Sequence, residues 1–362
     1  MAVVWIPSLL RSVTGGKDTV KVPGGTVGQV IEALEKLHPG IRARLCEGDR
    51  LRAGIAVSVD TQIARRGLRQ PVGPASEVHF VPAVSGGAPS KPRILMCPPD
   101  FYGIEYEINP WMSRSRGSVP EKAHGQWRNL FNTLVSLGVQ VELLTPRQGL
   151  PDLVFTANAG LVFKDRFFSS RFRHGVRARE TPYFEAWVAE HGFKVEHLPQ
   201  DVFFEGAGDA LFCGPTLFAG YRIRSDVGGH QYLGKVLHKL VLPLELVDPR
   251  FYHLDTCFCP LAPGQALYFP TAFDSYGRKV LASQIPTLIP VQEPEAIRFA
   301  CNAVVVGNTV IHNSGCDRLA ADLRKLGYEC IALELDEFLK AGGSAKCLTL
   351  RLDGEEAAIW DD

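Results

Sequence analysis

The sequence predicts an α/β protein of two domains, a small α+β domain at the N-terminus and a much larger α/β region after it. The chain has 362 residues, which is enough for two or three domains with a large core. A proline-rich stretch at 88–92 separates two parts with different patterns. In the second part, paired strands followed by a helix and a further strand recur at a length of ~50 residues, which is typical of folds that close radially.

The composition excludes several classes of protein. The formal net charge is zero, so no polybasic surface indicates binding to nucleic acid or to an anionic membrane. No apolar run is long enough to span a bilayer, and the N-terminus lacks a signal peptide, so we expect a cytoplasmic protein. The nine cysteines have neither disulfide-framework nor zinc-site spacing, so we expect reduced thiols, no metal and no cofactor.

Residues 1–87 are expected to form the first domain. Thr26 is positioned to cap a helix from Val27 to Leu37, whose apolar residues fall on one face before Pro39-Gly40 end it. Alternating apolar residues predict two strands before this helix and two after it, at 3–7, 18–22, 55–59 and 78–81.

This first domain resembles the ubiquitin-like sulfur carriers of the molybdopterin-synthase small-subunit and thiamine-biosynthesis type, which implies a β-grasp fold. The resemblance rests on Ile6-Pro7 with Leu10-Arg11, Gly25-Thr26-Val27, Leu51-Arg52 and the tail from Phe80 to Gly87. In that family the last glycine is the chain end that becomes activated, whereas here Ala88 follows Gly87. Either a protease exposes Gly86-Gly87 to an E1-like partner, or the domain is a binding or solubilising module.

Residues 93–362 are expected to form the second domain, after the linker 88–92. Arg93–Pro98 predicts its first strand, and Trp127, Leu130, Phe131 and Leu134 predict a helix over 120–137. Further helices are expected near 181–191, 228–240 and 316–326. Strands are expected at 139–144, 153–156, 159–163, 195–197, 210–213, 244–247, 304–306, 309–311 and 329–332, with a hairpin near 253–269.

The segment GGSAKCLTL at 342–350 holds a thiol at the edge of the predicted core, because its glycine pair permits a sharp turn before an apolar run. A cysteine in such a place is commonly a small buried hydrophobe. Upstream, however, HLDT at 253–256, FEGAGD at 204–209 and DLVFTAN at 152–158 place a histidine and acids at strand ends, as attack on an electron-poor carbon requires. Cys316 also follows a glycine, but it is expected to begin a helix.

These motifs, in this order from about Arg93 onward, resemble the guanidino-group-modifying superfamily of arginine deiminases, dimethylarginine hydrolases and amidinotransferases. The resemblance implies a five-bladed pseudo-symmetric α/β propeller with the active site on its axis. It assigns Cys347 as the nucleophile and His253 with Asp255 as the histidine motif. Glu205 matches the acid of the Glu-Gly-x-Asp segment, and one extra residue precedes Asp209, which we place in the substrate pocket.

The chemistry of a guanidinium group fits these assignments. Its carbon is a poor electrophile, and a carboxylate such as Glu205 can hold its plane through paired N–H bonds. His253 would protonate the leaving nitrogen and then deprotonate water, while Asp255 would bind substrate or orient the histidine. In the basic segment 171–180, Arg177 is favoured over Arg179 as the family's carboxylate-binding arginine, with a solvated loop as the alternative.

Asn158 occupies a position where deiminases and dimethylarginine hydrolases have an aspartate. With PPDFY at 98–102 and YEINPWM at 106–112, it makes the chain resemble the cyanobacterial-type arginine dihydrolases. Those enzymes convert arginine to ornithine, two ammonia and carbon dioxide, and Asn109 and Asn158 match their pocket asparagines. An amide both donates and accepts, so it can hold guanidinium and neutral ureido groups alike. The alternative is a structural turn, which asparagine before Ala-Gly also favours.

The sequence therefore predicts a cysteine hydrolase of arginine that forms a covalent amidino-cysteine intermediate. Three alternatives stay open: a deiminase-type hydrolase that yields citrulline, an amidinotransferase that uses an amine in place of water, and a sulfur-carrier or docking protein whose large domain is only a scaffold.

Overall fold

The computed structural model describes residues 1–6, 13–48, 50–52, 55–60, 62–64, 67–82 and 91–359. The chain divides into two compact units, Met1–Ser90 and Lys91–Asp362. Pro7, Leu10 and Arg11, the Gly86-Gly87 tail and most of the expected linker lie outside the described residues. The two units are described separately below.

The first unit packs a helix against a mixed sheet of strand order β2-β1-β7-β5-β6, in which β1 and β7 are parallel. The expected order of two strands, a helix and two strands is confirmed. Thr26 caps α1, because its Oγ1 accepts a hydrogen bond from Gln29 N at 3.3 Å. The elements are β1 (Ala2–Trp5), β2 (Thr19–Val22), α1 (Val27–Leu37), α2 (Ile41–Leu45), β3 (Cys46–Glu47), β4 (Arg50–Leu51), β5 (Ile55–Val59), β6 (Gln62–Ile63), η2 (Gly67–Arg69) and β7 (Glu77–Pro82).

The second unit contains five three-stranded sheets that share one connectivity. In each sheet the middle strand pairs antiparallel with one neighbour and parallel with the other, and a helix precedes the parallel strand. The sheets are β10 (Gly160–Phe163), β11 (Arg166–Ser169) and β12 (Lys194–Glu196); β13 (Ala210–Cys213), β14 (Thr216–Tyr221) and β15 (Val241–Glu245); β16 (Phe258–Ala262), β17 (Gln265–Tyr268) and β18 (Thr287–Pro290); β19 (Val304–Val306), β20 (Thr309–Asn313) and β21 (Glu329–Leu333); and β22 (Leu350–Arg351), β8 (Arg93–Met96) and β9 (Gln140–Leu143).

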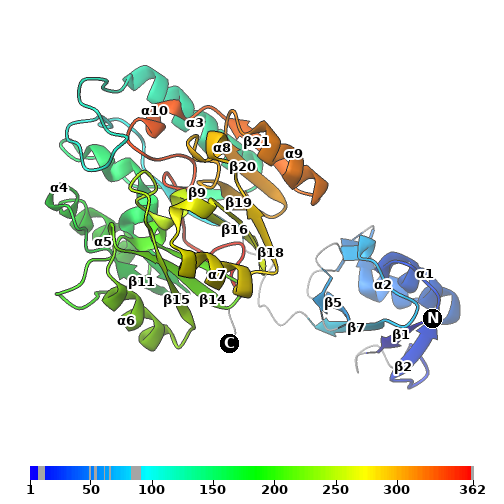
Figure 1. Ribbon diagram of the computed structural model, residues 1–362. Coiled ribbons are helices and arrows are strands. Elements are labelled where there is room, and N and C mark those ends of the chain that lie inside the picture. The colour runs from blue at the N-terminus through cyan, green and yellow to red at the C-terminus, as the bar shows by residue number, and fades with distance from the viewer. Residues whose placement is uncertain are drawn as a thin grey trace. The chain divides into compact units, whose positions relative to one another are not determined.

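The fifth sheet joins the two ends of this unit, since β22 near the C-terminus pairs with β8 at the start. The short helix α10 (Asp336–Leu339) likewise lies beside α3 (Pro120–Ser136) (Figure 1). The repeat inferred from the sequence is therefore present as five copies of one unit. Cys347 lies just before β22, in the copy formed by β22, β8 and β9.

Four of the helices that connect two strands of the same sheet were predicted within three residues of their ends. They are α3, α5 (Thr181–Glu190), α6 (Val227–Leu237) and α9 (Asp317–Lys325). The helix α7 (Ser275–Gln284) was missed, because only Gly277 and Leu281 are buried and no apolar stripe marks it. Asp274 caps it by accepting a hydrogen bond from Gly277 N at 2.7 Å. The remaining short helices are α4 (Gly175–Ala178) and α8 (Glu293–Ala296).

The strand expected over 153–156 is wrong. The chain here forms two buried 3₁₀ turns, η3 (Pro151–Val154) and η4 (Thr156–Ala159), with Phe155 between them. A short apolar run has no periodicity by which a buried strand could be told from a buried turn. The turns carry the chain inward and place Asn158 at the centre of the unit.

No helix in the described part of the chain is long and apolar enough to cross a membrane.

Candidate active site

The turn that precedes the first strand of each sheet brings one polar side chain to a common centre. These side chains are Asn158, Glu205, His253, Asn302 and Cys347, and all five residues are buried. Their spacing in the sequence reflects the repeat. Glu205 follows Asn158 by 47 residues and precedes His253 by 48. Cys347 follows Asn302 by 45 residues. The site is therefore assembled from equivalent positions of five structural repeats.

Two glycines allow these turns to approach one another. Gly206 has a φ of 63° and lies so close to Gly160 that an added Cβ would meet its backbone at 2.7 Å. A Cβ on Gly208 would meet Asn158 Nδ2 at 2.2 Å. The glycines of the FEGAGD segment are therefore required because two neighbouring turns touch there.

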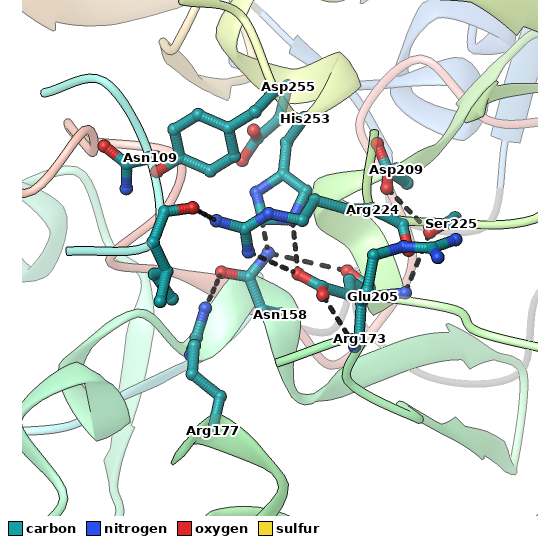
Figure 2. Close-up of polar contacts among 12 residues, drawn as sticks. Asn109, Asn158, Arg173, Arg177, Glu205, Asp209, Arg224, Ser225, His253 and Asp255 are labelled. Atoms are coloured by element: carbon teal, nitrogen blue, oxygen red, sulfur yellow. Dashed lines mark hydrogen bonds and ion pairs between the residues drawn. The ribbon is translucent and has the colours of Figure 1, made fainter. Parts of the chain in front are cut away.

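His253 and Glu205 form a buried pair, with 2.7 Å between His253 Nε2 and Glu205 Oε2 (Figure 2). Because a carboxylate only accepts, Nε2 carries the proton and Nδ1 is left as the acceptor, which faces Asn158 Nδ2 at 3.5 Å. Burial lowers the pKa of His253 to about 4, although Glu205 opposes this shift. The imidazole is therefore neutral near pH 7, with an available lone pair on Nδ1.

The contacts of Glu205 differ from the role expected for it. Its Oε2 also accepts from Arg224 Nη1 at 3.0 Å, and its Oε1 accepts from Arg173 N at 3.1 Å. Burial would raise the pKa of Glu205, but Arg224 and then His253 outweigh it and hold the pKa below its ordinary value. A carboxylate engaged in this way orients His253 and has no free pair of oxygens with which to hold a guanidinium plane.

Cys347 lies between a donor and an acceptor. Its Sγ is 3.3 Å from Asp255 Oδ2, and Asn302 Nδ2 donates to the same sulfur at 3.1 Å. Burial and then Asp255 raise the pKa of the Cys347 thiol well above its ordinary value. Burial also raises the pKa of Asp255 to about 7. Without a cation nearby, the sulfur is therefore held as a thiol.

Arg177 reaches the site, but most of its donors are already used. Its Nε and Nη2 form a two-pronged pair with Glu180, both at 2.8 Å, and its Nη1 donates to Asn158 Oδ1 at 2.9 Å (Figure 2). Nη2 also donates to Asp152 O at 3.2 Å. Four of the five N–H groups of Arg177 are therefore used, and the one that is left belongs to Nη1. Arg177 thus fixes the orientation of the Asn158 amide, whereas Arg179 is exposed.

Asn109 and Asp209 are held by neighbouring backbone and side chains. Asn109 lines the cavity and donates to Ala341 O at 3.0 Å, while its Oδ1 accepts from Trp111 N. Asp209 accepts from Ser225 Oγ at 2.6 Å and from Leu254 N at 3.0 Å. It does not line the cavity, in contrast to the position expected for it, and it links the segments that carry Glu205 and His253 (Figure 2).

A small cavity lies at Cys347. Two buried carboxylate oxygens of this region, Asp152 Oδ1 and Asp255 Oδ1, have no hydrogen-bond partner among the described residues. Through its other oxygen Asp152 pairs with Arg177 Nε at 3.8 Å, and Asp255 accepts from the Cys347 thiol. Each carboxylate therefore keeps one buried oxygen that a cationic ligand can satisfy. The cavity is lined by Ile108, Asn109, Met112, Asp152, Phe155, Asn158, Arg177, Arg224, Tyr252, Ala341, Gly342 and Cys347.

Sequence reasoning missed two residues of this site. Arg224 follows β14 in the segment RIRSD and looks like a surface charge there, yet it is buried, contacts Glu205 and lines the cavity. Asn302 precedes β19, and its only sequence signal is its position in the repeat, one repeat length after His253.

Comparison with known proteins agrees with this geometry. The family described as N,N dimethylarginine dimethylhydrolase, eukaryotic, matches residues 106–353. The chain belongs to this family. The resemblance to guanidino-modifying enzymes is thereby confirmed, and the ThiS family matches residues 4–87, as expected for the first domain.

Relatives of this dimethylarginine dimethylhydrolase family member include the bifunctional arginine dihydrolase/ornithine cyclodeaminase ArgZ of Synechocystis, 51% identical over 265 residues. That match covers 72% of the chain and 37% of ArgZ, so the chain spans well under half of this relative. The N(G),N(G)-dimethylarginine dimethylaminohydrolase of Mycobacterium tuberculosis is 37% identical over 281 residues, covering 75% of the chain and 91% of that protein.

A solved structure of the N-terminal domain of ArgZ, a cysteine-to-serine mutant bound to substrate, matches with a TM-score of 0.71 and 49% identity. It covers 74% of the chain and 100% of that domain. A dimethylarginine dimethylaminohydrolase structure with 22% identity and a TM-score of 0.63 shows the same fold. The second unit therefore has the fold of this family, and the first has a ThiS-type β-grasp fold.

Proposed function

We propose that the second domain is a hydrolase that converts arginine to ornithine, two ammonia and carbon dioxide through a covalent intermediate on Cys347. The observation that carries the proposal is one cavity lined by the buried Cys347 thiol and by Asp152, with Asp255 Oδ2 only 3.3 Å from the sulfur. Arginine supplies two cationic groups, a guanidinium and an α-ammonium. The similarity to the substrate-bound ArgZ domain, described as an arginine dihydrolase, supports the same substrate.

The guanidinium group is placed at Asp255. Its Oδ1 is free to accept an N–H, while its Oδ2 faces the Cys347 thiol. A bound cation there stabilises both the carboxylate and a thiolate, which turns the resting thiol into a nucleophile when substrate arrives. Asp255 is thus the substrate-binding acid of the site, and Glu205 is the residue that orients the histidine.

The other end of arginine is placed among Asp152, Arg224 and Arg177. Asp152 Oδ1 is free to accept from the α-ammonium. Arg224 lines the cavity and retains donors beyond its bonds to Glu205 and to Ile108 O at 2.9 Å, so with the remaining N–H of Arg177 it can hold the α-carboxylate.

The reaction needs two rounds at one carbon. Cys347 attacks the guanidinium carbon, and its thiol proton passes to His253 Nδ1, which delivers it to the departing ammonia. Nδ1 then deprotonates a water that releases citrulline, and the proton it gains returns to the sulfur. A second attack on the ureido carbon expels the second ammonia. Water then releases the carbamate of ornithine from the sulfur, and this carbamate decomposes to ornithine and carbon dioxide. Two waters are consumed in all, and the thiol is regenerated.

The test is incubation with arginine, with ornithine, citrulline and ammonia measured by mass spectrometry and enzymatic assay. Ornithine with two ammonia per arginine supports the proposal. Parallel incubations with dimethylarginine and with an added amine acceptor would reveal a different substrate or amidino transfer. If none of these substrates is consumed and arginine does not protect any thiol from alkylation, the domain is a scaffold and the hydrolase proposal is wrong.

Arginine binding is expected to weaken as the pH falls below about 7. Asp255 has a raised pKa of about 7, so it is charged above this pH and neutral below it, and only the charged form attracts the guanidinium. Calorimetric titration of the Cys347→Ser variant with arginine from pH 8.5 to 5.5 should show affinity falling by up to ~10-fold per pH unit below 7. Adding Asp255→Asn should remove most of this dependence. An unchanged slope in the double variant would assign the dependence to another group.

A deiminase that stops at citrulline is the second candidate, and Asn158 separates the two. Asn158 Oδ1 is fixed by Arg177, so its Nδ2 faces His253 Nδ1 and Glu205 O. In Asn158→Asp this Nδ2 donor is replaced by a second carboxylate oxygen. A carboxylate at this position binds a cationic group in preference to a neutral ureido group. We expect this variant to release citrulline as its main product. If ornithine remains the sole product, Asn158 does not retain the intermediate.

We further propose that the five sheets are the blades of a closed five-bladed propeller, because they share one connectivity and β22 completes the sheet of β8. The domains are proposed as 1–87 and 93–362 with a linker at 88–92. An E1-like or processing partner for Gly86-Gly87 stays a prediction, as does location in the cytoplasm.

A further inference from the structure

The Asn302 side chain forms three hydrogen bonds to the segment 342–350, which carries the thiol. Its Oδ1 accepts from Ser344 N and Cys347 N, both at 3.1 Å. Its Nδ2 donates to Asp255 O and to Cys347 Sγ, both at 3.1 Å. The side chain is fully buried, and these four bonds use its whole capacity of two donors and two acceptor sites.

We propose that Asn302 is the positioning residue of the nucleophile, which fixes the turn that holds Cys347 and supplies an N–H donor to its sulfur. This inference deepens the proposed function, since it rests on the role of Cys347 there. Asn302 acts through the cysteine and is not itself placed in contact with substrate.

The orientation of the amide follows from its partners. Two backbone N–H groups, of Ser344 and Cys347, point at one end of the carboxamide, so that end must be the oxygen. The opposite end faces a carbonyl oxygen and the sulfur, and both accept from N–H groups. A flipped amide would lose all four bonds, so the donor to the sulfur is fixed by the fold.

The donor matters because the carboxylate that faces the sulfur, Asp255, disfavours the charged form of the thiol. Asp255 Oδ2 lies 3.3 Å from Sγ and repels a thiolate. Lys346 is adjacent in sequence, but its ammonium is paired with Glu355 at 2.7 Å. Among the described residues, the Asn302 amide is therefore the side-chain donor that stabilises negative charge on the sulfur.

The test is the pH dependence of Cys347 alkylation in the full chain with Asn302→Asp. Iodoacetamide is applied from pH 6 to 10 without arginine, and modification of the Cys347 peptide is followed by mass spectrometry. The variant replaces the N–H donor by an oxygen. The rate of Cys347 alkylation should therefore rise at a pH at least about one unit higher than in the wild type, with ~10-fold slower alkylation at pH 8. Turnover at saturating arginine should fall while KM changes little.

Asn313→Asp is the matched control, because Asn313 is equally buried and also bridges two backbone groups, Leu335 N and Arg298 O, away from the thiol. It should leave the alkylation profile unchanged. Asn302→Ala, which adds no charge, is the second variant and should move the profile in the same direction. The proposal is overturned if both folded Asn302 variants keep the wild-type profile. Failure of the wild-type chain to consume arginine would overturn only the proposed function, since alkylation needs no substrate.

Discussion

Cys347→Ser is expected to lower turnover of arginine by roughly 10⁴-fold or more, since loss of a covalent nucleophile removes the whole reaction path. A serine hydroxyl in this position has no base strong enough to ionise it, because the adjacent Asp255 already has a pKa of about 7. Arginine should still bind, because the groups that hold its charges are intact. The measurement is initial ammonia release together with calorimetric titration.

Cys316→Ser is the matched control for this experiment. Cys316 is a buried cysteine that also follows a glycine, and its Sγ lies 4.0 Å from Glu295 O, which a serine hydroxyl can contact as well. It should retain turnover near the wild-type rate. If Cys316→Ser were inactive and Cys347→Ser active, the nucleophile would be misassigned.

His253→Gln is expected to lower the rate at saturating arginine by roughly 10³-fold, which is the scale of general acid–base catalysis. Glutamine can still donate to Glu205, so the buried carboxylate keeps a partner, but it cannot carry a proton from thiol or water to the leaving nitrogen. The effect should lie in kcat, with arginine binding largely kept. Single-turnover analysis of ammonia release measures the chemical step directly.

His230→Gln tests whether any buried histidine would give the same result. His230 is fully buried on α6, packs against Phe204, and has no hydrogen-bond partner on either ring nitrogen among the described residues. Its replacement should leave turnover close to that of the wild type. Comparable losses in the two variants would mean that His253 acts only through packing.

The sequence was sufficient to select most of the polar residues that gather at the site. It was not sufficient to predict which of them contact one another. Cys347, His253, Glu205 and Asn158 each stand beside glycines or apolar strand residues, a local pattern that marks a polar group at a strand end. Their pairing is not local. Glu205 faces His253 and Asp255 faces Cys347 because of the neighbouring turn that each carboxylate meets, and no single segment records that.

Arg177 shows the same limit. As a basic residue it suited a carboxylate ligand, but Glu180, one helical turn later, takes two of its donors once both are buried. Arg224 and Asn302 carried no chemical motif, since an arginine after a strand and an asparagine before one are common on surfaces. Their burial results from contacts with segments that are far apart in the sequence, such as Ile108 for Arg224 and Cys347 for Asn302.

By itself the sequence determined the two-part organisation, the repeating strand and helix units and the guanidino-modifying family, because periodicity, turn residues and short motifs are properties of neighbouring positions. Only the tertiary structure decided which acid faces the sulfur, which acid contacts the histidine, and that Asn302 contacts the Cys347 sulfur. The physical reason is that the hydrogen bonds and charges at this site join five turns, each about one repeat from the next. Their energies depend on distances that arise only when the unit closes.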